Sequence, residues 1–209
     1  MTFSVTLLPD LVLGCLRVKS FESAGNPENL IDFKEEDEMP LTEEKMREFV
    51  GIDSELIEGP DQVCKQMIRH WCEVMEDTNP LYQNDEYADK SKYGGIIAPP
   101  MQVQVYTMSP LWPKANREPN SMELLVAELA KQGYSSIVAT EQGQEYFAPM
   151  KLGDQISYTI SVDKISSEKQ TVRGPGYFVT FLYKFYNQRE ELVCKQTFTI
   201  LAYNAISKE

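Results

Sequence analysis

The last third of the chain carries a period-two pattern that requires a β-sheet with one buried face. In residues 155–162 the odd positions are polar and the even positions are Ile156, Tyr158, Ile160 and Val162. Successive side chains of a strand point to opposite faces, so this segment predicts a half-buried strand. Residues 136–147, 177–187 and 192–203 are three further β-rich runs, and residues 187–191 join the last two as a hairpin turn. Four long antiparallel strands predict a curved sheet with one apolar face.

An apolar segment upstream is suited to fill the concave side of that sheet. Residues 101–109 follow two glycines and two prolines, and their apolar members are Met101, Val103, Val105, Tyr106 and Met108. Proline in a first turn predicts a helix start, and a helix that is apolar nearly all round is usually buried. We therefore expect an α+β fold in which an antiparallel β-sheet wraps around a long central α-helix. Met101, Tyr106 and Met108 are expected in the core, with the lining of a tunnel as the alternative.

Two more helices are predicted. Residues 61–76 place apolar side chains at helical spacing behind Asp61, the expected N-cap. That stripe consists of Val63, Met67, Ile68, Trp71, Cys72 and Met75. The single histidine, His70, falls on the polar side and is expected at the surface. Residues 121–132 form the second helix, where Asn120 and Glu123 make a capping box and a glycine marks the end.

The charge balance excludes several classes of function. The chain has 209 residues, with 20 Lys and Arg against 32 Asp and Glu, for a net charge of −12. Nucleic-acid binders concentrate positive charge for phosphates, and no basic stripe exists here, so we expect no nucleic-acid partner. An anionic membrane surface is disfavoured for the same reason, and no apolar run approaches the ~20 residues that span a bilayer.

Domain organisation and cysteine usage complete the compositional argument. Residues 1–44 differ from the rest and end near an acidic run, so we expect a flexible or partly disordered N-terminal extension followed by one domain over residues 45–209. The four cysteines, Cys15, Cys64, Cys72 and Cys194, are widely spread without a Cys-x-x-Cys pair. This spacing disfavours a zinc site, so we expect no metal, and it fits reduced thiols in the cytoplasm.

The most informative motif lies between Trp71 and Ala88. It reads Asp77, Thr78, Asn79, Pro80, Leu81 and Tyr82, and Ala88 follows after five residues. This resembles the signature of MaoC-like, type-2 enoyl-CoA hydratases. Segments 93–98, 147–154 and 187–193 agree with the family in order, so the resemblance covers about residues 45–204. It implies the hotdog fold, which is a sheet around a helix, and acyl-thioester substrates.

The departures from that family carry as much information. The family uses Asp and His together to activate water, and its His position is Tyr82 here. A phenol has a pKa near 10, so at neutral pH it is a poor base but can donate a hydrogen bond. The family also binds the thioester oxygen with a backbone N–H at the start of the central helix, where this chain has Pro99 and Pro100. Proline has no N–H, so a donor is missing unless Ala98 or Met101 replaces it.

The resemblance implies a set of site residues. Asp77 and Tyr82 occupy the catalytic positions, although turn formation explains an Asp and Asn before proline equally well. The positions implied for substrate binding are Asn79, Gly94, Gly95, Ile96, Ile97, Ala98 and Met101. No cofactor is implied, because a thioester of CoA or of an acyl carrier protein is the substrate itself.

The substitutions at the catalytic His position and at the N–H donor position favour an assembly in which one subunit catalyses the reaction and the other shapes the substrate site. We expect the chain to be the non-catalytic, substrate-shaping half of a heteromeric enoyl-CoA hydratase, beside a second hotdog subunit with intact Asp and His. One alternative is an active homodimeric hydratase or dehydratase that uses Asp77. The other is a non-enzymatic module that binds acyl-CoA or an acyl carrier protein.

Overall fold

The structure is a computed structural model in which residues 42–110, 112 and 118–205 are described. The predicted N-terminal extension, residues 1–44, lies almost wholly outside this part of the chain, as does Cys15. The loop expected over residues 110–120 lies partly outside it.

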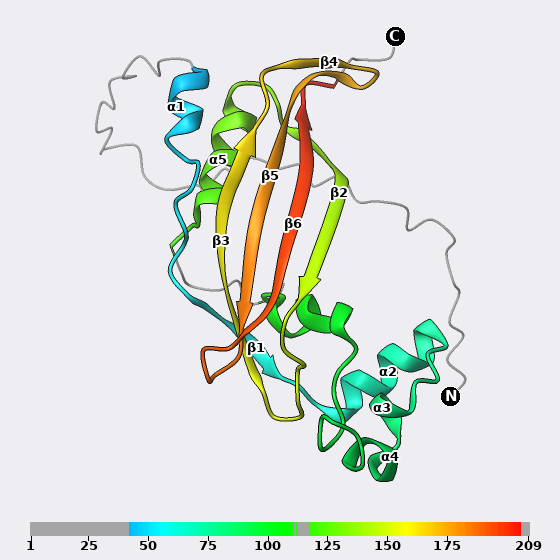
Figure 1. Cartoon of the computed structure of the whole chain (residues 1–209). Coiled ribbons are helices and arrows are strands. Elements are labelled where there is room, and N and C mark those ends of the chain that lie inside the picture. Colours follow the sequence, from blue (N-terminus) through cyan, green and yellow to red (C-terminus); the bar gives the residue numbers. More distant parts are fainter. Residues whose placement is uncertain (1–41, 111, 113–117, 206–209) are drawn as a thin grey trace, which may run out of the picture. The chain divides into compact units, whose positions relative to one another are not determined.

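The described residues form one six-stranded antiparallel sheet (Figure 1). Its strands are β1 (Ile57–Gln62), β2 (Ser136–Tyr146), β3 (Gln155–Ile165), β4 (Lys169–Thr171), β5 (Gly174–Tyr186) and β6 (Leu192–Tyr203). The four long strands predicted from periodicity are confirmed as β2, β3, β5 and β6. The order is β1-β3-β5-β6-β2, with β4 paired to β5, so the consecutive strands β2 and β3 lie apart and β2 ends the sheet.

The register places the apolar side chains of neighbouring strands on one face. Val162 of β3 pairs with Phe181 of β5, which pairs with Phe198 of β6. Tyr158 and Phe185 form a second such pair, and their ring centroids are 5.9 Å apart. Most of these side chains are buried, whereas the opposite face of β3 carries Ser157, Thr159 and Ser161. The alternation read from the sequence therefore separates a core face from a polar one.

The predicted long central α-helix is wrong in length and type. Residues 101–109 instead contribute to η1, an eight-residue 3-10 helix over Pro100–Thr107. Its first turn closes with a bond from the N–H of Gln102 to the carbonyl of Pro99 at 2.9 Å. Prolines limit η1 at both ends. The pair at its start lacks N–H donors, and Pro110 disfavours a helical conformation in the residue before it. The α+β class is confirmed, because helices pack against the apolar face of the sheet.

Only part of η1 reaches the core. Val103 and Tyr106 are fully buried against the sheet, whereas Met101 is 57% and Met108 66% exposed. Of the three residues expected in the core, Tyr106 alone is buried there. Gln102 and Thr107 are buried as well, so the buried face of η1 consists of residues 102, 103, 106 and 107.

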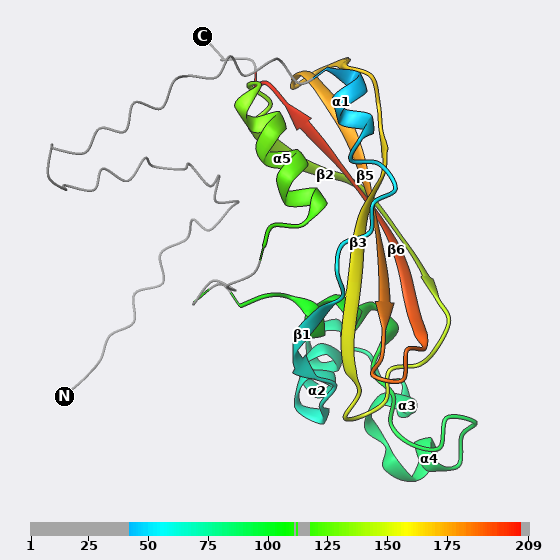
Figure 2. The same cartoon turned by 90° about the vertical axis from the view of Figure 1, so that its left-hand side faces the viewer.

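A second helix, α5 (Ser121–Lys131), shares the apolar face with η1 and lies along the strands (Figure 2). Its predicted capping box is confirmed: the Asn120 side chain accepts from the N–H of Glu123, whose carboxylate accepts from the N–H of Asn120. Leu125 and Leu129 are buried one helical turn apart. Two short helices thus occupy the place expected for one long helix.

Helix α2 spans Lys65–Met75, so the helix predicted over residues 61–76 begins four residues too early. Asp61 lies in β1 rather than at a cap, and Cys64 is the N-cap without a side-chain bond. Pairing explains the difference, because β1 is held against β3 until Gln62. The predicted apolar stripe is buried at Val63, Ile68 and Cys72, whereas Met67 and Met75 are exposed.

The remaining helices are α1 (Glu43–Arg47), α3 (Pro80–Gln83) and α4 (Asp85–Asp89). His70 is exposed on α2 beside Glu73, at 3.4 Å, as predicted for a surface residue. The described cysteines, Cys64, Cys72 and Cys194, are free thiols.

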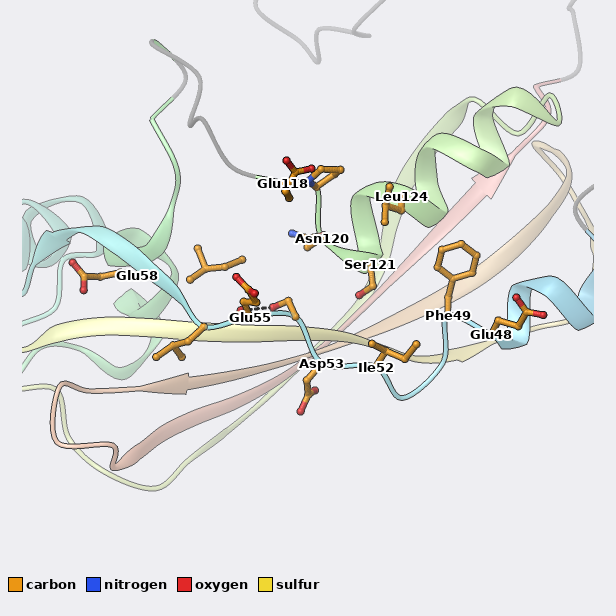
Figure 3. A pocket seen from close by; sticks show the side chains of 14 residues that line it. Glu48, Phe49, Ile52, Asp53, Glu55, Glu58, Glu118, Asn120, Ser121 and Leu124 are labelled. Carbon is orange, nitrogen blue, oxygen red and sulfur yellow. Dashed lines mark hydrogen bonds between the residues drawn. The ribbon is translucent and has the colours of Figure 1, made fainter. Parts of the chain in front are cut away.

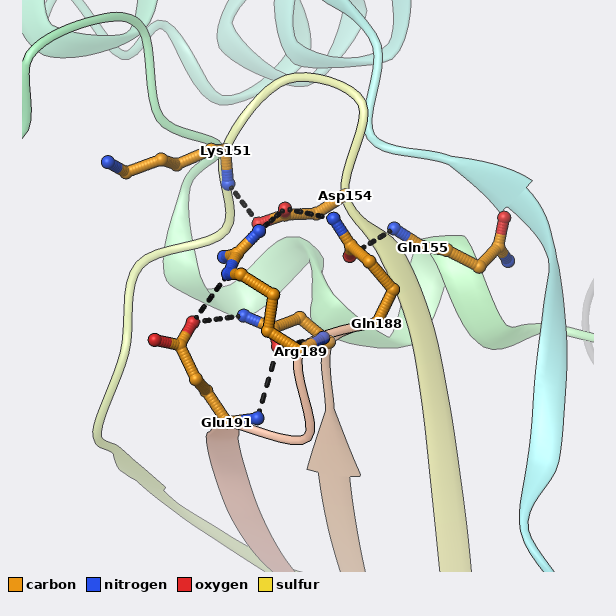
Figure 4. A network of polar contacts seen from close by, with 7 residues as sticks. Lys151, Asp154, Gln155, Gln188, Arg189 and Glu191 are labelled. Carbon is orange, nitrogen blue, oxygen red and sulfur yellow. Dashed lines mark hydrogen bonds and ion pairs between the residues drawn. The ribbon is translucent and has the colours of Figure 1, made fainter.

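A buried carboxylate ties the start of β3 to the β5–β6 hairpin (Figure 4). Asp154 is 2% exposed and accepts from the N–H of Lys151 at 2.8 Å, from Gln188 at 3.1 Å and from Arg189 at 2.9 Å. Arg189 also donates to Glu191 at 2.9 Å. The segments that matched the family near residues 152–154 and 187–191 therefore form one structural clamp.

Two structural findings concern membrane spanning and metal binding. No helix among the described residues is long and apolar enough to cross a membrane. Over the same residues, no group of three or more His, Cys, Asp and Glu side chains is arranged to hold a metal ion.

Candidate functional site

The Asp77 motif forms a tight turn between α2 and α3. Helix α2 ends at Met75, and its C-cap Glu76 adopts a left-handed conformation with φ of 53°. The carboxylate of Asp77 accepts from the N–H of Asn79 at 3.0 Å, and the Asn79 side chain accepts from the N–H of Leu81 at 3.1 Å, where it caps α3. Both polar side chains of the motif therefore stabilise local backbone.

Asp77 and Tyr82 lie close enough to influence one another electrostatically. Burial raises the pKa of Tyr82 above its usual value, the negative charge of Asp77 raises that pKa further, and a hydrogen bond with Asn79 lowers it. Both residues are only partly buried. The phenol thus keeps its proton at neutral pH and can donate a hydrogen bond, but it cannot serve as a base.

Two further residues at this turn were not anticipated from the motif. Cys72 is buried, and its burial raises the pKa of its thiol, which the charge of Asp77 raises further. The Gln83 side chain donates to the backbone carbonyl of Asp77 at 2.7 Å. Cys72 lies five residues before Asp77, at the end of the buried stripe of α2. This position in the sequence could have predicted that it lies beside Asp77. A protonated thiol is a weak nucleophile, so Cys72 serves packing.

The glycine segment before η1 is held by its backbone. Gly94 and Gly95 have φ of 64° and 146°, which side chains rarely adopt, so glycine is required there. The N–H of Ile97 donates to the carbonyl of Leu81 at 3.3 Å, and the N–H of Ala98 donates to that of Met150 at 2.9 Å. The N–H of Ala98, one of the two donors expected to substitute for the N–H that Pro99 and Pro100 lack, is therefore occupied.

Four of the predicted site residues, Tyr82, Ile96, Ile97 and Ala98, line two small pockets. One pocket of about 280 Å³ is lined by Tyr82, Gln83 and Ile96 together with Lys65, Gln66, Arg69 and Asp85 of α2 and α4. Another, of about 260 Å³, is lined by Ile97, Ala98 and Pro100, by residues 146–150 at and after the end of β2, and by Lys92, Tyr93 and Val193. Neither lining includes Asp77, Asn79 or Met101.

A much larger cavity of about 810 Å³ lies between the segment leading into β1 and the start of α5 (Figure 3). Its apolar wall consists of Phe49, Ile52, Leu56, Ile57, Pro119 and Leu124. Within this wall, Ile52 and Leu56 are 58% and 62% exposed. No motif marked these residues, because they come from segments about 65 positions apart in the sequence.

The comparison with known protein families agrees with this description of the fold and of the Asp77 turn. Residues 48–196 match the family described as FAS1-like, dehydratase domain region. The chain belongs to this family. The FAS1-like dehydratase region covers β1 to β5 and the start of β6, both helices on the apolar face of the sheet, and the Asp77 turn. The resemblance to MaoC-like hydratases and the hotdog fold are thereby confirmed.

Individual relatives of this FAS1-like chain are informative. A protein of Thermomonospora curvata named "Probable enoyl-CoA hydratase alpha subunit" is 38% identical over 164 residues, which are 77% of this chain and 51% of that protein. The chain thus spans about half the length of this curated relative. A chain of the ChsH1–ChsH2 complex from Mycobacterium tuberculosis is 28% identical with a TM-score of 0.69, over 75% of this chain and 86% of that one. A MaoC-like dehydratase from Rhodospirillum rubrum shares the fold at 18% identity, TM-score 0.51, over 73% of this chain and 93% of that one.

Proposed function

We propose that this chain is the non-catalytic, substrate-shaping half of a heteromeric enoyl-thioester hydratase. The observation that carries the proposal is the pair Asp77 and Tyr82. Water addition needs a base, and the partner that stands beside Asp77 is a phenol whose pKa is raised. The carboxylate of Asp77 is itself engaged with the N–H of Asn79.

A second deficiency supports the same conclusion. The thioester oxygen becomes negatively charged during hydration and needs aligned N–H donors. Pro99 and Pro100 have none, and the N–H of Ala98 is bound to Met150. The loss of one such donor costs on the order of 10²–10³ in rate. A single chain would have to compensate for both deficiencies.

The outer edge of β2 is suited to a second hotdog subunit. This strand ends the described sheet, so one row of its backbone groups has no strand partner there. Ile137, Tyr146 and Phe147 on or just after it are 49%, 42% and 48% exposed. Exposed apolar edges are typical sites for strand addition. The pocket that contains Ala98 lies at the end of β2, where such a subunit would contribute to its wall.

The large cavity is suited to the acyl group. Its volume of about 810 Å³ lies in the range of small-molecule sites, and its wall contains many apolar side chains. The relatives support the heteromeric part of the proposal, since one is named an alpha subunit of an enoyl-CoA hydratase and another was solved as a two-component complex.

The test compares the pure chain with the chain plus its hotdog partner, on crotonyl-CoA and longer enoyl-CoA thioesters. We expect hydration only with the partner, and no loss beyond about twofold in the complex when Asp77 is changed to Asn. Hydration by the chain alone at ordinary enzyme rates, abolished by Asp77→Asn, would instead establish the active homodimer. Acyl-CoA binding without turnover in either preparation would establish a binding module.

A further inference from the structure

The pocket of about 280 Å³ that contains Tyr82, called the Tyr82 pocket below, groups two cations in a strongly acidic chain. Lys65 and Arg69 both line it, and they lie one turn apart on α2. Because the net charge of the chain is −12, an anion is attracted only where cations are grouped locally. The described residues that line the large cavity include carboxylates but neither lysine nor arginine. Of these two pockets, the Tyr82 pocket is therefore the one suited to an anion.

The ion pairs of the two cations leave N–H donors available. Lys65 pairs with Asp85 at 2.6 Å, and an ammonium group has three donors, so this carboxylate does not use them all. Arg69 lies 3.9 Å from Glu73, which is too far for a hydrogen bond. Its planar guanidinium thus keeps the arrangement of donors that matches the oxygens of a phosphate.

Neutral donors complete the lining. Tyr82 is half-buried in the pocket, and its hydrogen bond with Asn79 lowers the pKa of Tyr82, as a bond donated to the phenol oxygen does. The proton of the phenol therefore remains for an acceptor. Gln66 adds an amide to the same lining. Cations together with neutral donors make short, strong hydrogen bonds to an anionic oxygen.

We infer that the Tyr82 pocket binds the phosphate at the end of a pantetheine arm, with Lys65 and Arg69 contacting its oxygens and Tyr82 donating to it. The inference rests on the proposed function, which makes an acyl thioester the ligand. CoA and acyl carrier proteins both carry their acyl group on a pantetheine arm that ends in a phosphate. The same pocket therefore serves a thioester from either source.

The pocket lies within reach of the cavity assigned above to the acyl group. Ile57 and Glu58, at the start of β1, line that cavity, whereas Lys65 follows the end of β1 and lines the Tyr82 pocket. Figure 1 shows β1 leading to α2, with α3 and α4 beside that helix. From residue 58 to residue 65 the backbone spans at most about 25 Å. An extended acyl-pantetheine chain can therefore occupy both places.

The test measures calorimetric binding of octanoyl thioesters to the full chain with its hotdog partner. Saturated thioesters cannot be hydrated, so affinity is measured apart from catalysis. Octanoyl-pantetheine lacks the phosphate, octanoyl-phosphopantetheine adds it, and octanoyl-CoA and octanoyl-acyl carrier protein represent the two sources. Octanoyl-phosphopantetheine should bind about 5- to 20-fold more tightly than octanoyl-pantetheine. Arg69→Ala should remove most of this preference and leave octanoyl-pantetheine binding unchanged, with folding checked by thermal melting.

Two further variants test the site more closely. Lys90→Ala removes an exposed cation that pairs with Glu86 and does not line the Tyr82 pocket, so it should alter no affinity. Tyr82→Phe removes one hydroxyl and should weaken the phosphate-bearing probes about 2- to 5-fold. A loss in Lys90→Ala equal to that in Arg69→Ala would reduce the effect to overall charge and overturn the inference.

The probes also distinguish the sources and the possible failures. The natural source is octanoyl-CoA or octanoyl-acyl carrier protein, whichever loses affinity in Arg69→Ala. A preference for octanoyl-CoA without one for octanoyl-phosphopantetheine would assign the cations to the nucleotide and contradict the inference. If all probes bind and Arg69→Ala affects them equally or not at all, the inference is wrong and the proposed function stands. If no probe binds to the complex, the proposed function is itself wrong.

Discussion

The carboxylate of Asp77 accepts a hydrogen bond from the backbone N–H of Asn79 at 3.0 Å. This bond fixes the turn between α2 and α3, and Asn79 continues it by capping α3. The residue that matches a catalytic position of the family is therefore engaged in local structure. The two roles can be separated experimentally, because an amide oxygen keeps the acceptor but loses the charge.

For Asp77 we predict that stability depends on the acceptor and that activity of the complex does not depend on the charge. Asp77→Ala should cost about 1 kcal/mol, or about 2–4 °C in melting temperature, because the turn bond is lost. Asp77→Asn should stay within about 0.5 kcal/mol of the parent chain. A large loss of hydratase activity in the Asn variant at unchanged melting temperature would contradict the structural assignment.

For Tyr82 we predict that restoring the family residue does not restore catalysis. Tyr82→His supplies a base beside Asp77, but Pro99 and Pro100 have no N–H and the N–H of Ala98 is bound to Met150, so the oxyanion still lacks these donors. The gain in hydration by the isolated chain should remain below about 10-fold, because each missing donor costs on the order of 10²–10³. Steady-state rates on crotonyl-CoA measure this, and a gain of several orders of magnitude would show that the donors are present.

For Gly59 we predict severe destabilisation by a single methyl group. A Cβ at Gly59 would lie 2.1 Å from the carbonyl oxygen of Tyr106 and 2.8 Å from that of Ile156, and backbone cannot rotate away. Gly59→Ala should cost about 3 kcal/mol or more in chemical unfolding. Gly143→Ala is the matched control, since its Cβ would lie 2.9 Å from the Thr197 hydroxyl, which can change rotamer.

For the clamp at the β5–β6 hairpin we predict unequal roles of its two carboxylates. Asp154→Ala leaves three donors without their shared acceptor and should cost about 2–3 kcal/mol. Glu191→Ala removes a partner of Arg189 at the surface and should change the free energy of unfolding much less. Equal effects of the two variants in urea unfolding would mean that Asp154 is not the centre of the network.

For Asp53 we predict a pH-dependent contribution to stability. Its hydrogen bond with Lys184 lowers the pKa of the carboxyl below its ordinary value of 3.8, with Ser161 acting in the same direction and burial against it. A depressed pKa stabilises the fold above the unfolded value, and the contribution disappears as pH falls through the folded value. Asp53→Asn should therefore cost up to about 1 kcal/mol near pH 7, and progressively less as the pH falls through the folded-state pKa of Asp53, measured by unfolding across the acidic range.

The sequence predicted the elements whose signals are local. The alternation at residues 155–162 marks β3, and Asn120 with Glu123 marks the start of α5, because both patterns act over a few residues. The start of α2 was misplaced because β1 depends on pairing with β3, about 100 residues away in sequence, and on the close approach of Gly59 to Tyr106. Helical spacing alone could not reveal either contact.

The candidate site was predicted in the same uneven way. The motif predicted turn-forming roles for Asp77 and Asn79, and the structure agrees, whereas Tyr82 lies in α3 after that turn. It could not show that the N–H of Ala98 is bound to Met150, since that contact joins distant segments. The cavity beside Ser121 results from packing between the segment before β1 and α5, so no short sequence pattern could predict it.

The composition of β2 has a consequence for the chain that could pair with it. The charged side chains of this strand are Glu141 and Glu145, and both are exposed. Charged side chains on a free edge hinder pairing with another strand, and two carboxylates repel the same strand of a second copy. A second subunit that joins this edge, as proposed above, should therefore carry lysine or arginine opposite the two glutamates.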